Sequence, residues 1–155
     1  MCVFGAVKLG SRKLTVFSIG CFLVFLPVCV IMLRAGGRDS VKIGGENYPT
    51  AVEDDGDIGR FLAACGCADA VCVTDEAVTV PEIWNETYED YQELQEAQGF
   101  DLVPYKGKAA RMLVWSVDSG ADYATVLVSG NRIIAAHRGG MMQDEPMTPL
   151  IGNDS

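Results

Sequence analysis

The sequence predicts an α+β protein: an N-terminal transmembrane helix, then a small antiparallel sheet packed by one long and one short helix. Two observations lead to this fold class. A run of twenty residues without a charge lies near the N-terminus, and two helical patterns alternate with short β-prone runs in the acidic remainder of the 155-residue chain. Tight turn signals between the last β-prone runs favour an antiparallel sheet that carries the helices.

Charge divides the chain near the same boundary. Residues 1–42 hold six of the twelve Lys and Arg and one acid, a net charge of about +5, whereas residues 43–155 hold six bases and twenty acids, about −14. A basic, apolar end joined to an acidic end is typical of a membrane-anchored protein. The acidic part should repel phosphate groups, so we expect no nucleic-acid partner.

The apolar run, Leu14–Leu33, lies between Lys13 and Arg34. A helix of this length spans about 30 Å, the thickness of the hydrocarbon core of a bilayer. We therefore expect a single-pass transmembrane helix over 14–34 that contacts membrane lipid through Leu14–Leu33. The tail over 1–13 would be cytoplasmic and the C-terminal domain extracytoplasmic. A cleaved signal peptide is the alternative, although its apolar run is usually shorter.

Residues 35–56 are predicted to form a flexible linker, because glycine pairs, Pro49 and a run of acids bring no apolar period. The globular domain, 57–136, begins with a short helix that Asp57 can cap. Its apolar residues recur at i, i+3, i+4 and i+7: Ile58, Phe61, Leu62 and Cys65. Gly66 is placed to end this helix in the left-handed conformation.

The long helix is predicted over Pro81–Gln98, with proline in the first turn and Gly99 at the end. Before it, Ala70–Val73 and Ala77–Val80 are β-prone runs on either side of a turn-like Thr74-Asp75-Glu76. The helix has an apolar stripe that we expect to face the core: Trp84, Tyr88, Tyr91 and Leu94. Its other face is acidic and expected to be solvated: Glu82, Glu86, Glu89, Asp90, Glu93 and Glu96.

Three strand-like segments follow: Ala109–Val117, Tyr123–Val128 and Arg132–Ala136. The last two are joined by Gly130-Asn131, a two-residue loop that favours a tight hairpin. Glycines and prolines then predict an irregular or disordered tail over 137–155.

Val78–Lys108 holds a series of motifs in fixed order and spacing: the Tyr88/Tyr91/Leu94 stripe, Gln98-Gly99-Phe100-Asp101-Leu102 and Tyr105-Lys106-Gly107-Lys108. This series resembles domain-of-unknown-function family 4830, which is found in anchored or secreted proteins of Gram-positive bacteria. About half of the chain is covered, and the sequence departs from the pattern after Ile134. The resemblance implies the fold and an extracytoplasmic location. It implies no activity, because the family has none assigned.

The thiols outside the apolar run and Cys2 are Cys65, Cys67 and Cys72. In an exported domain, a disulfide from Cys72 to Cys65 or Cys67 would join helix to strand. The alternative is that all three fill the core as small apolar residues, which the place of Cys65 on an apolar stripe favours. Their spacing lacks the two pairs of a zinc site, so we expect no metal.

No cofactor motif or catalytic constellation is visible, and the single histidine, His137, has no evident partner in the sequence. The sequence therefore predicts a non-enzymatic binding module for a protein or an envelope ligand, on the sheet face that the helix leaves open. Two alternatives stay open. One is an envelope hydrolase or thiol redox enzyme that uses Cys67, Cys72 or His137. The other is an extracytoplasmic subunit of a signalling complex.

Overall fold

The computed structural model describes residues 39–139 and 146–152. The predicted tail 1–13, the predicted transmembrane helix and the first residues of the predicted linker lie outside this part of the chain. Among the residues described, no helix has the length and apolar character needed to cross a bilayer. The transmembrane helix therefore stays a prediction.

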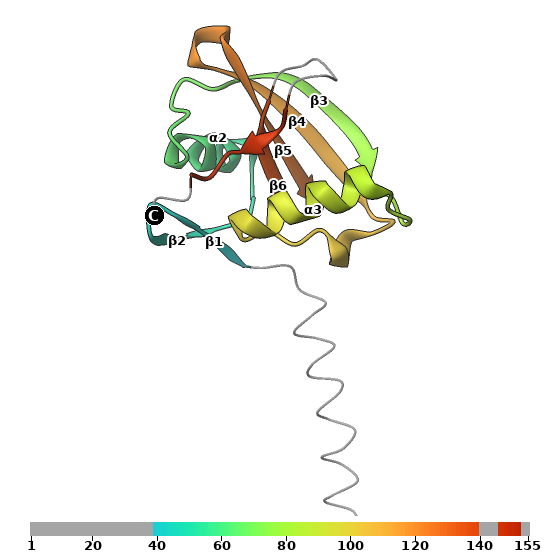
Figure 1. The fold of residues 1–155 in the computed structure, drawn as a ribbon. Coiled ribbons are helices and arrows are strands. Elements are labelled where there is room, and N and C mark those ends of the chain that lie inside the picture. The colour runs from blue at the N-terminus through green and yellow to red at the C-terminus, as the bar shows by residue number, and fades with distance from the viewer. Residues whose placement is uncertain (1–38, 140–145, 153–155) are drawn as a thin grey trace, which may run out of the picture. The chain divides into compact units, whose positions relative to one another are not determined.

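A five-stranded antiparallel sheet occupies the centre of the described domain (Figure 1). Its strands neighbour one another in chain order: β3 (Val71–Thr79), β4 (Ala109–Val117), β5 (Asp122–Ser129), β6 (Arg132–Arg138) and β7 (Thr148–Pro149). A second sheet is a hairpin of β1 (Ser40–Ile43) and β2 (Glu46–Pro49). The helices are α2 (Asp55–Ala64) and α3 (Glu86–Gln98), with short 3-10 turns η1 (Val103–Tyr105) and η2 (Asp118–Gly120). The predicted α+β class is confirmed.

The two helices pack on opposite faces of the large sheet. Successive strand residues point to opposite faces, so Leu113 and Ala110 of β4 lie on different sides. Leu113 belongs to a buried cluster with Phe61 of α2, whereas Ala110 belongs to a cluster against which Tyr91 of α3 packs. The sheet thus separates two cores, and the prediction of a binding site on a sheet face left open by the helix is wrong, because each face carries a helix.

The N-cap of helix α2 lies three residues before the predicted cap. Asp54, not Asp57, is the N-cap: its carboxylate accepts the backbone N–H of Asp57 at 3.2 Å, and the Asp57 carboxylate accepts the N–H of Asp54 at 3.3 Å. This reciprocal pair is a capping box. The predicted apolar face is confirmed, with Ile58, Phe61 and Leu62 fully buried, and Gly66 follows with φ +88°.

The two β-prone runs before α3 are one strand, β3. The predicted turn residues Thr74, Asp75 and Glu76 pair with Val114, Leu113 and Met112 of β4. The ladder shifts between Cys72 and Thr74, where one extra residue forms a β-bulge. Polar and charged residues are tolerated here because β3 is an edge strand.

Helix α3 begins at Glu86, five residues later than predicted. Asn85 is its N-cap, since its side-chain oxygen accepts the N–H of Tyr88 at 3.1 Å, and Pro81 lies before the helix. Gly99, with φ +96°, ends the helix as predicted.

The predicted stripe is confirmed only in part: Trp84 and Tyr91 pack against a buried cluster, but the residues that α3 buries fully are others. Its buried residues are three glutamines, Gln92, Gln95 and Gln98. Tyr91 and Leu94 are half-buried, Tyr88 is 39% exposed and Trp84 lies outside the helix. The spacing of apolar residues could not predict this face, because the glutamine side chains are buried through hydrogen bonds to backbone groups and not through apolar packing.

Residues 39–56 differ from the predicted flexible linker. In the β1–β2 hairpin, Val41 is buried and pairs with Tyr48. The chain then joins the large sheet, where the N–H of Val52 donates to the carbonyl of Asn131 at 2.8 Å. The physical reason is the Gly44-Gly45 loop: both glycines have positive φ, which a two-residue hairpin of this kind requires.

The predicted irregular tail, 137–155, also contains ordered elements. Strand β6 continues to Arg138, and β7 pairs with it. Leu150 and Ile151 are buried, and their backbone N–H groups donate to Oε1 of Gln98 at 2.7 and 3.0 Å. A side chain on a distant helix holds this segment, so its local composition of prolines and glycine did not reveal it.

Candidate functional site

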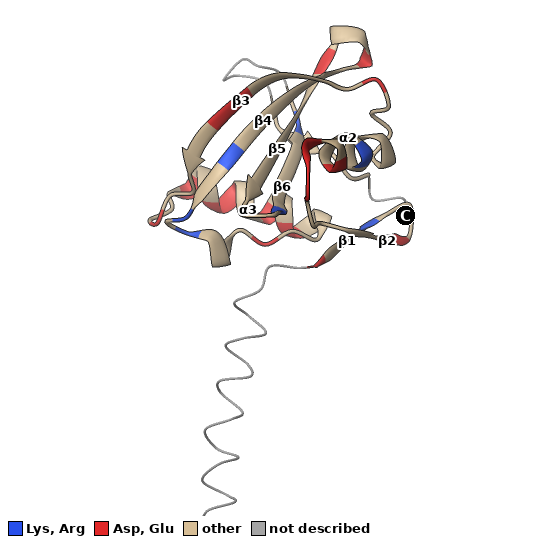
Figure 2. Ribbon diagram, turned by 180° about the vertical axis from the view of Figure 1, so that it is seen from behind, with Lys and Arg blue, Asp and Glu red and all other residues tan. Residues whose placement is uncertain are grey.

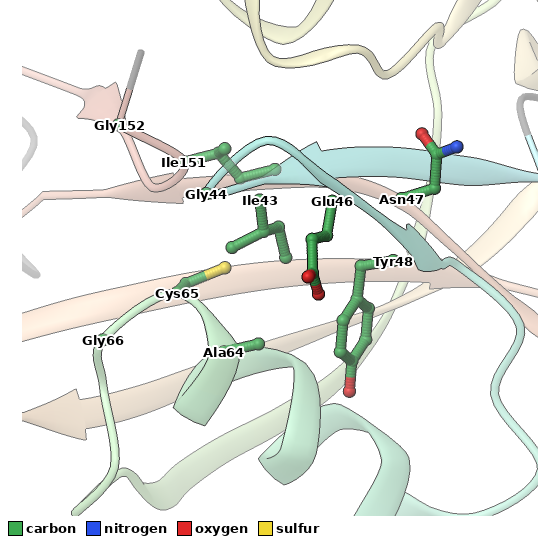
Figure 3. A pocket seen from close by; sticks show the side chains of 10 residues that line it. All are labelled: Ile43, Gly44, Glu46, Asn47, Tyr48, Ala64, Cys65, Gly66, Ile151 and Gly152. Carbon is green, nitrogen blue, oxygen red and sulfur yellow. The ribbon is translucent and has the colours of Figure 1, made fainter. Parts of the chain in front are cut away.

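A pocket of about 600 Å³ opens between the β1–β2 hairpin, the end of α2 and the C-terminal segment (Figure 3). This size is in the range of small-molecule sites. The pocket is lined by Ile43, Gly44, Glu46, Asn47, Tyr48, Ala64, Cys65, Gly66, Ile151 and Gly152. Every lining residue belongs to the described part of the chain.

The walls of the pocket combine one hairpin face with the last turn of α2. Ile43 pairs with Glu46 across the hairpin, so both side chains lie on one face, and Figure 3 shows Glu46 and Tyr48 reaching toward α2. Tyr48 fixes the hairpin on this helix, because its ring packs edge-on against Phe61 at 5.9 Å between centroids. Ile43, Ala64 and Ile151 supply an apolar lining.

Glu46 is the one charged residue among those that line the pocket. Within the part of the chain described, no Lys or Arg lies within ion-pair distance of Glu46. Two nearby cations pair with other acids: Arg60 pairs with Asp57, and Arg138 lies 3.4 Å from Asp118 and 3.8 Å from Asp122. Lys42 belongs to the same hairpin as Glu46 and pairs across it with Asn47 of the pocket wall. The negative end of the α2 dipole adds to the field, since no base stands in its last turn.

The three predicted thiols are free, and only two of them share surroundings. Cys65 lines the pocket, and burial, with a further contribution from neighbouring Cys67, raises the pKa of its thiol to about 12. Cys67 is 2% exposed, and Nη2 of Arg138 donates to its sulfur at 3.0 Å. Cys72 is exposed on β3, where its thiol donates to the carbonyl of Thr74 at 3.5 Å. The structure holds no disulfide from Cys72 to either of the others.

His137 has a partner, contrary to the reading of the sequence. The hydroxyl of Tyr91 lies 3.0 Å from its Nδ1, and the two rings meet edge-on at 5.4 Å. Burial lowers the pKa of His137 to about 4 and raises the pKa of Tyr91. A neutral, buried histidine that joins α3 to β6 is a structural contact, and neither residue lines the pocket.

The acids of α3 lie as predicted on an exposed face (Figure 2): Glu86, Glu89, Asp90, Glu93 and Glu96. Over residues 39–139 and 146–152, no group of three or more His, Cys, Asp or Glu side chains is arranged to hold a metal ion.

Sequence reasoning missed the residues that shape the pocket. Glu46 and Tyr48 fall in the predicted linker and Ile151 in the predicted tail. A signal for the hairpin was present, because Gly44-Gly45 separates Val41 and Ile43 from Tyr48 in alternating order. No comparable local signal marks Ile151, whose place depends on Gln98.

The chain matches no family model, no curated protein and no solved structure. The resemblance to family 4830 therefore stays a prediction.

Proposed function

We propose that this protein is a single-pass, membrane-anchored, extracytoplasmic binding module whose pocket receives an ammonium group on a short apolar stem. The observation that carries the proposal is the exposed carboxylate of Glu46, which has no ion-pair partner among the described residues and lines a pocket that Ile43, Ala64 and Ile151 make partly apolar. A ligand with this chemistry would pair with Glu46 and fill the space between Ile43, Ala64 and Ile151.

The proposed location of the module, anchored in a membrane, is supported by the sequence alone. Leu14–Leu33 is long enough and apolar enough to cross a bilayer, and the acidic domain follows it. An envelope ligand or the lysine side chain of a neighbouring protein would present the required ammonium group at the outer surface.

Binding is tested on the full-length protein in detergent micelles, by titration with n-butylammonium and with n-butyrate, which differs in charge but hardly in size. We expect millimolar or tighter binding of the cation and no measurable binding of the anion. The Glu46→Gln variant should bind the cation about tenfold more weakly, the cost of one charge-assisted hydrogen bond. Glu76→Gln, an exposed acid on β3 outside the pocket, is the matched control. Equal binding of both probes, or no effect of Glu46→Gln, would overturn the proposed site.

The location has a separate test. Intact cells of the source organism are treated with a protease, and the membrane fraction is then probed for the chain. We expect the domain to be digested from outside and the N-terminal remnant to stay in the membrane. Recovery of the intact chain in a soluble fraction without detergent would remove the anchor and leave the binding result untouched.

A further inference from the structure

The end of α2 places two thiols within one tight turn. Cys65 is the C-cap, and Gly66 follows with φ +88°. The N–H of Gly66 donates to the carbonyl of Ala63 at 3.0 Å, and the N–H of Cys67 donates to the carbonyl of Leu62 at 2.8 Å. These two bonds form a Schellman motif, which folds the chain back on the helix.

This turn brings the pair within reach of a disulfide. Residues two apart have Cα atoms at most about 7 Å apart, and a reversal of the chain shortens that distance. Disulfides join Cα atoms about 4.4–6.8 Å apart. Cys65 and Cys67 also share neighbours, since the charge of Arg138 acts on the Cys65 thiol as well as on Cys67. Cys72 is surrounded instead by Asp55, Asp75 and Arg111.

The two thiols differ in ways that suit two steps of one exchange reaction. Cys65 lines the pocket, where its sulfur can meet an external reagent (Figure 3). Cys67 is buried, and its sulfur accepts a hydrogen bond from the Arg138 guanidinium, which Asp118 and Asp122 hold in place. A buried thiol needs no access to solvent if its target is the neighbouring Cys65 sulfur.

We propose that Cys65 and Cys67 form a redox pair that closes to a disulfide by exchange with a small-molecule disulfide admitted by the pocket. Burial raises the pKa of the Cys65 thiol to about 12, so the rate of the first step rises with pH. Cys65 loses its proton to hydroxide and its thiolate attacks one sulfur of the reagent, which gives a mixed disulfide and releases one thiolate. Cys67 then gives its proton to the released thiolate and attacks the Cys65 sulfur of that mixed disulfide, which releases the second thiolate. Two protein thiols are oxidised to one disulfide, and the reagent is reduced to two thiols.

Closure has a consequence for the pocket. It takes the Cys67 sulfur away from its hydrogen bond with Arg138 and changes the direction of the Cys65 sulfur, which lines the pocket. A disulfide formed by exchange is opened again by an excess of thiol. The pair therefore acts as a reversible switch beside the proposed ligand site. The pair itself does not depend on the preference of that site for cations.

The test uses reduced full-length protein in detergent micelles and the uncharged reagent bis(2-hydroxyethyl) disulfide. Samples are quenched with an alkylating agent at intervals, and the peptide that holds all three cysteines is mapped by mass spectrometry. We expect the Cys65–Cys67 segment to lose two hydrogen atoms and escape alkylation, in the wild type and in Cys72→Ser alike. Cys72 should carry only the mixed disulfide, because it has no neighbouring thiol.

Variants separate the two steps. Cys67→Ser should hold the mixed disulfide on Cys65, and Cys65→Ser should form no internal disulfide. Arg138→Gln should let the mixed disulfide accumulate transiently, and Arg138→Lys, which keeps the charge, should restore much of the second step.

A disulfide that includes Cys72 would overturn the proposal. So would a wild-type protein in which Cys65 stays a mixed disulfide, or in which neither Cys65 nor Cys67 reacts while Cys72 does. The wild-type result decides the matter even if a variant at buried Cys67 fails to fold. Because the reagent carries no charge, failure of the cation site and failure of the thiol pair give different results.

Discussion

Helices α2 and α3 hold the same sheet by different chemistry. The inner face of α2 is apolar, with Ile58, Phe61 and Leu62 in the main buried cluster. The inner face of α3 carries three buried glutamines. A buried amide is costly unless its hydrogen bonds are made. Nε2 of Gln95 has no partner among the described residues, but the bonds of the other amide groups hold this helix in one position on the sheet. The attachment of α2 can be predicted from the periodic spacing of apolar residues in the sequence, whereas the attachment of α3 cannot.

The amides of α3 bind the backbone that the sheet leaves unpaired. Gln95 accepts the N–H of Ala136 at 2.9 Å, and Gln98 donates to the carbonyl of the same residue at 3.0 Å. β7 pairs with His137 and Arg138, the next residue of β6 is bound by side chains of α3, and the backbone of residues 50–52 bonds to the start of the strand. Covering an exposed edge in this way protects it from pairing with other chains.

This attachment also shapes the pocket. Oε1 of Gln98 holds the N–H groups of Leu150 and Ile151, and Ile151 is a wall of the pocket beside the hairpin. Helix α3 therefore supports the proposed ligand site through the C-terminal segment.

The largest expected effect is on the apolar helix. Phe61→Ala removes a fully buried ring that meets Tyr48 and Phe100 edge-on, and leaves a cavity between α2 and the sheet. We expect the free energy of unfolding to fall by about 3–5 kcal/mol in urea denaturation. A loss under about 1 kcal/mol would mean that α2 is not held by its apolar face.

Gln98→Leu is the corresponding test of the polar helix. Leucine keeps most of the volume but leaves two buried N–H groups and one carbonyl without their partner. We expect a loss of about 2–4 kcal/mol, whereas apolar burial alone would predict a gain. Glu93→Leu, an exposed change on the same helix, is the control and should stay within about 0.5 kcal/mol of wild type.

Low pH should reduce the free energy of unfolding through protonation of His137, which contacts α3. Its pKa is about 4 in the folded state, below the ordinary value of 6.5, so the unfolded state binds the proton more tightly. This contribution to stability is fully present above pH 6.5, falls as the pH drops toward 4, and amounts to about 2 kcal/mol between pH 7 and pH 5. His137→Gln should flatten the stability profile in this window. Profiles of equal slope for the two proteins would contradict the assignment.

The smallest effect on the free energy of unfolding should come from Tyr88, a residue of the predicted stripe. Tyr88→Ala changes a side chain on the outer side of α3 that is 39% exposed. We expect a change in unfolding free energy within about 0.5 kcal/mol, read from the same denaturation curves. A loss of 2 kcal/mol or more would return Tyr88 to the core and favour the apolar stripe over the glutamine face.

Prediction from sequence succeeded where local chemistry decides the structure. The apolar period of α2, the left-handed Gly66 and Gly99, and the Gly130-Asn131 hairpin are all local signals, and the structure confirms them. It failed where distant partners decide. Thr74-Asp75-Glu76 is drawn into β3 by pairing with β4, and Leu150-Ile151 is fixed by Gln98.

The candidate site was missed for a related reason. The Gly44-Gly45 pair, taken as a sign of flexibility, is a tight hairpin loop, and the hairpin carries Glu46 and Tyr48 to the end of α2. Cys65 was recognised from its spacing on the helix, but its closeness to Cys67 and to the charge of Arg138 depends on a turn and on a strand 71 residues away from Cys67 in the chain.

Amide hydrogen exchange at Leu150 and Ile151 tests most directly whether buried glutamines fasten α3 and the pocket wall. In the wild type these two amides should exchange slowly, on the scale of Val126 in β5. In Gln98→Leu they should exchange at nearly unprotected rates while Val126 keeps its protection. Fast exchange at both amides in the wild type, or slow exchange that survives the loss of Gln98, would contradict this account.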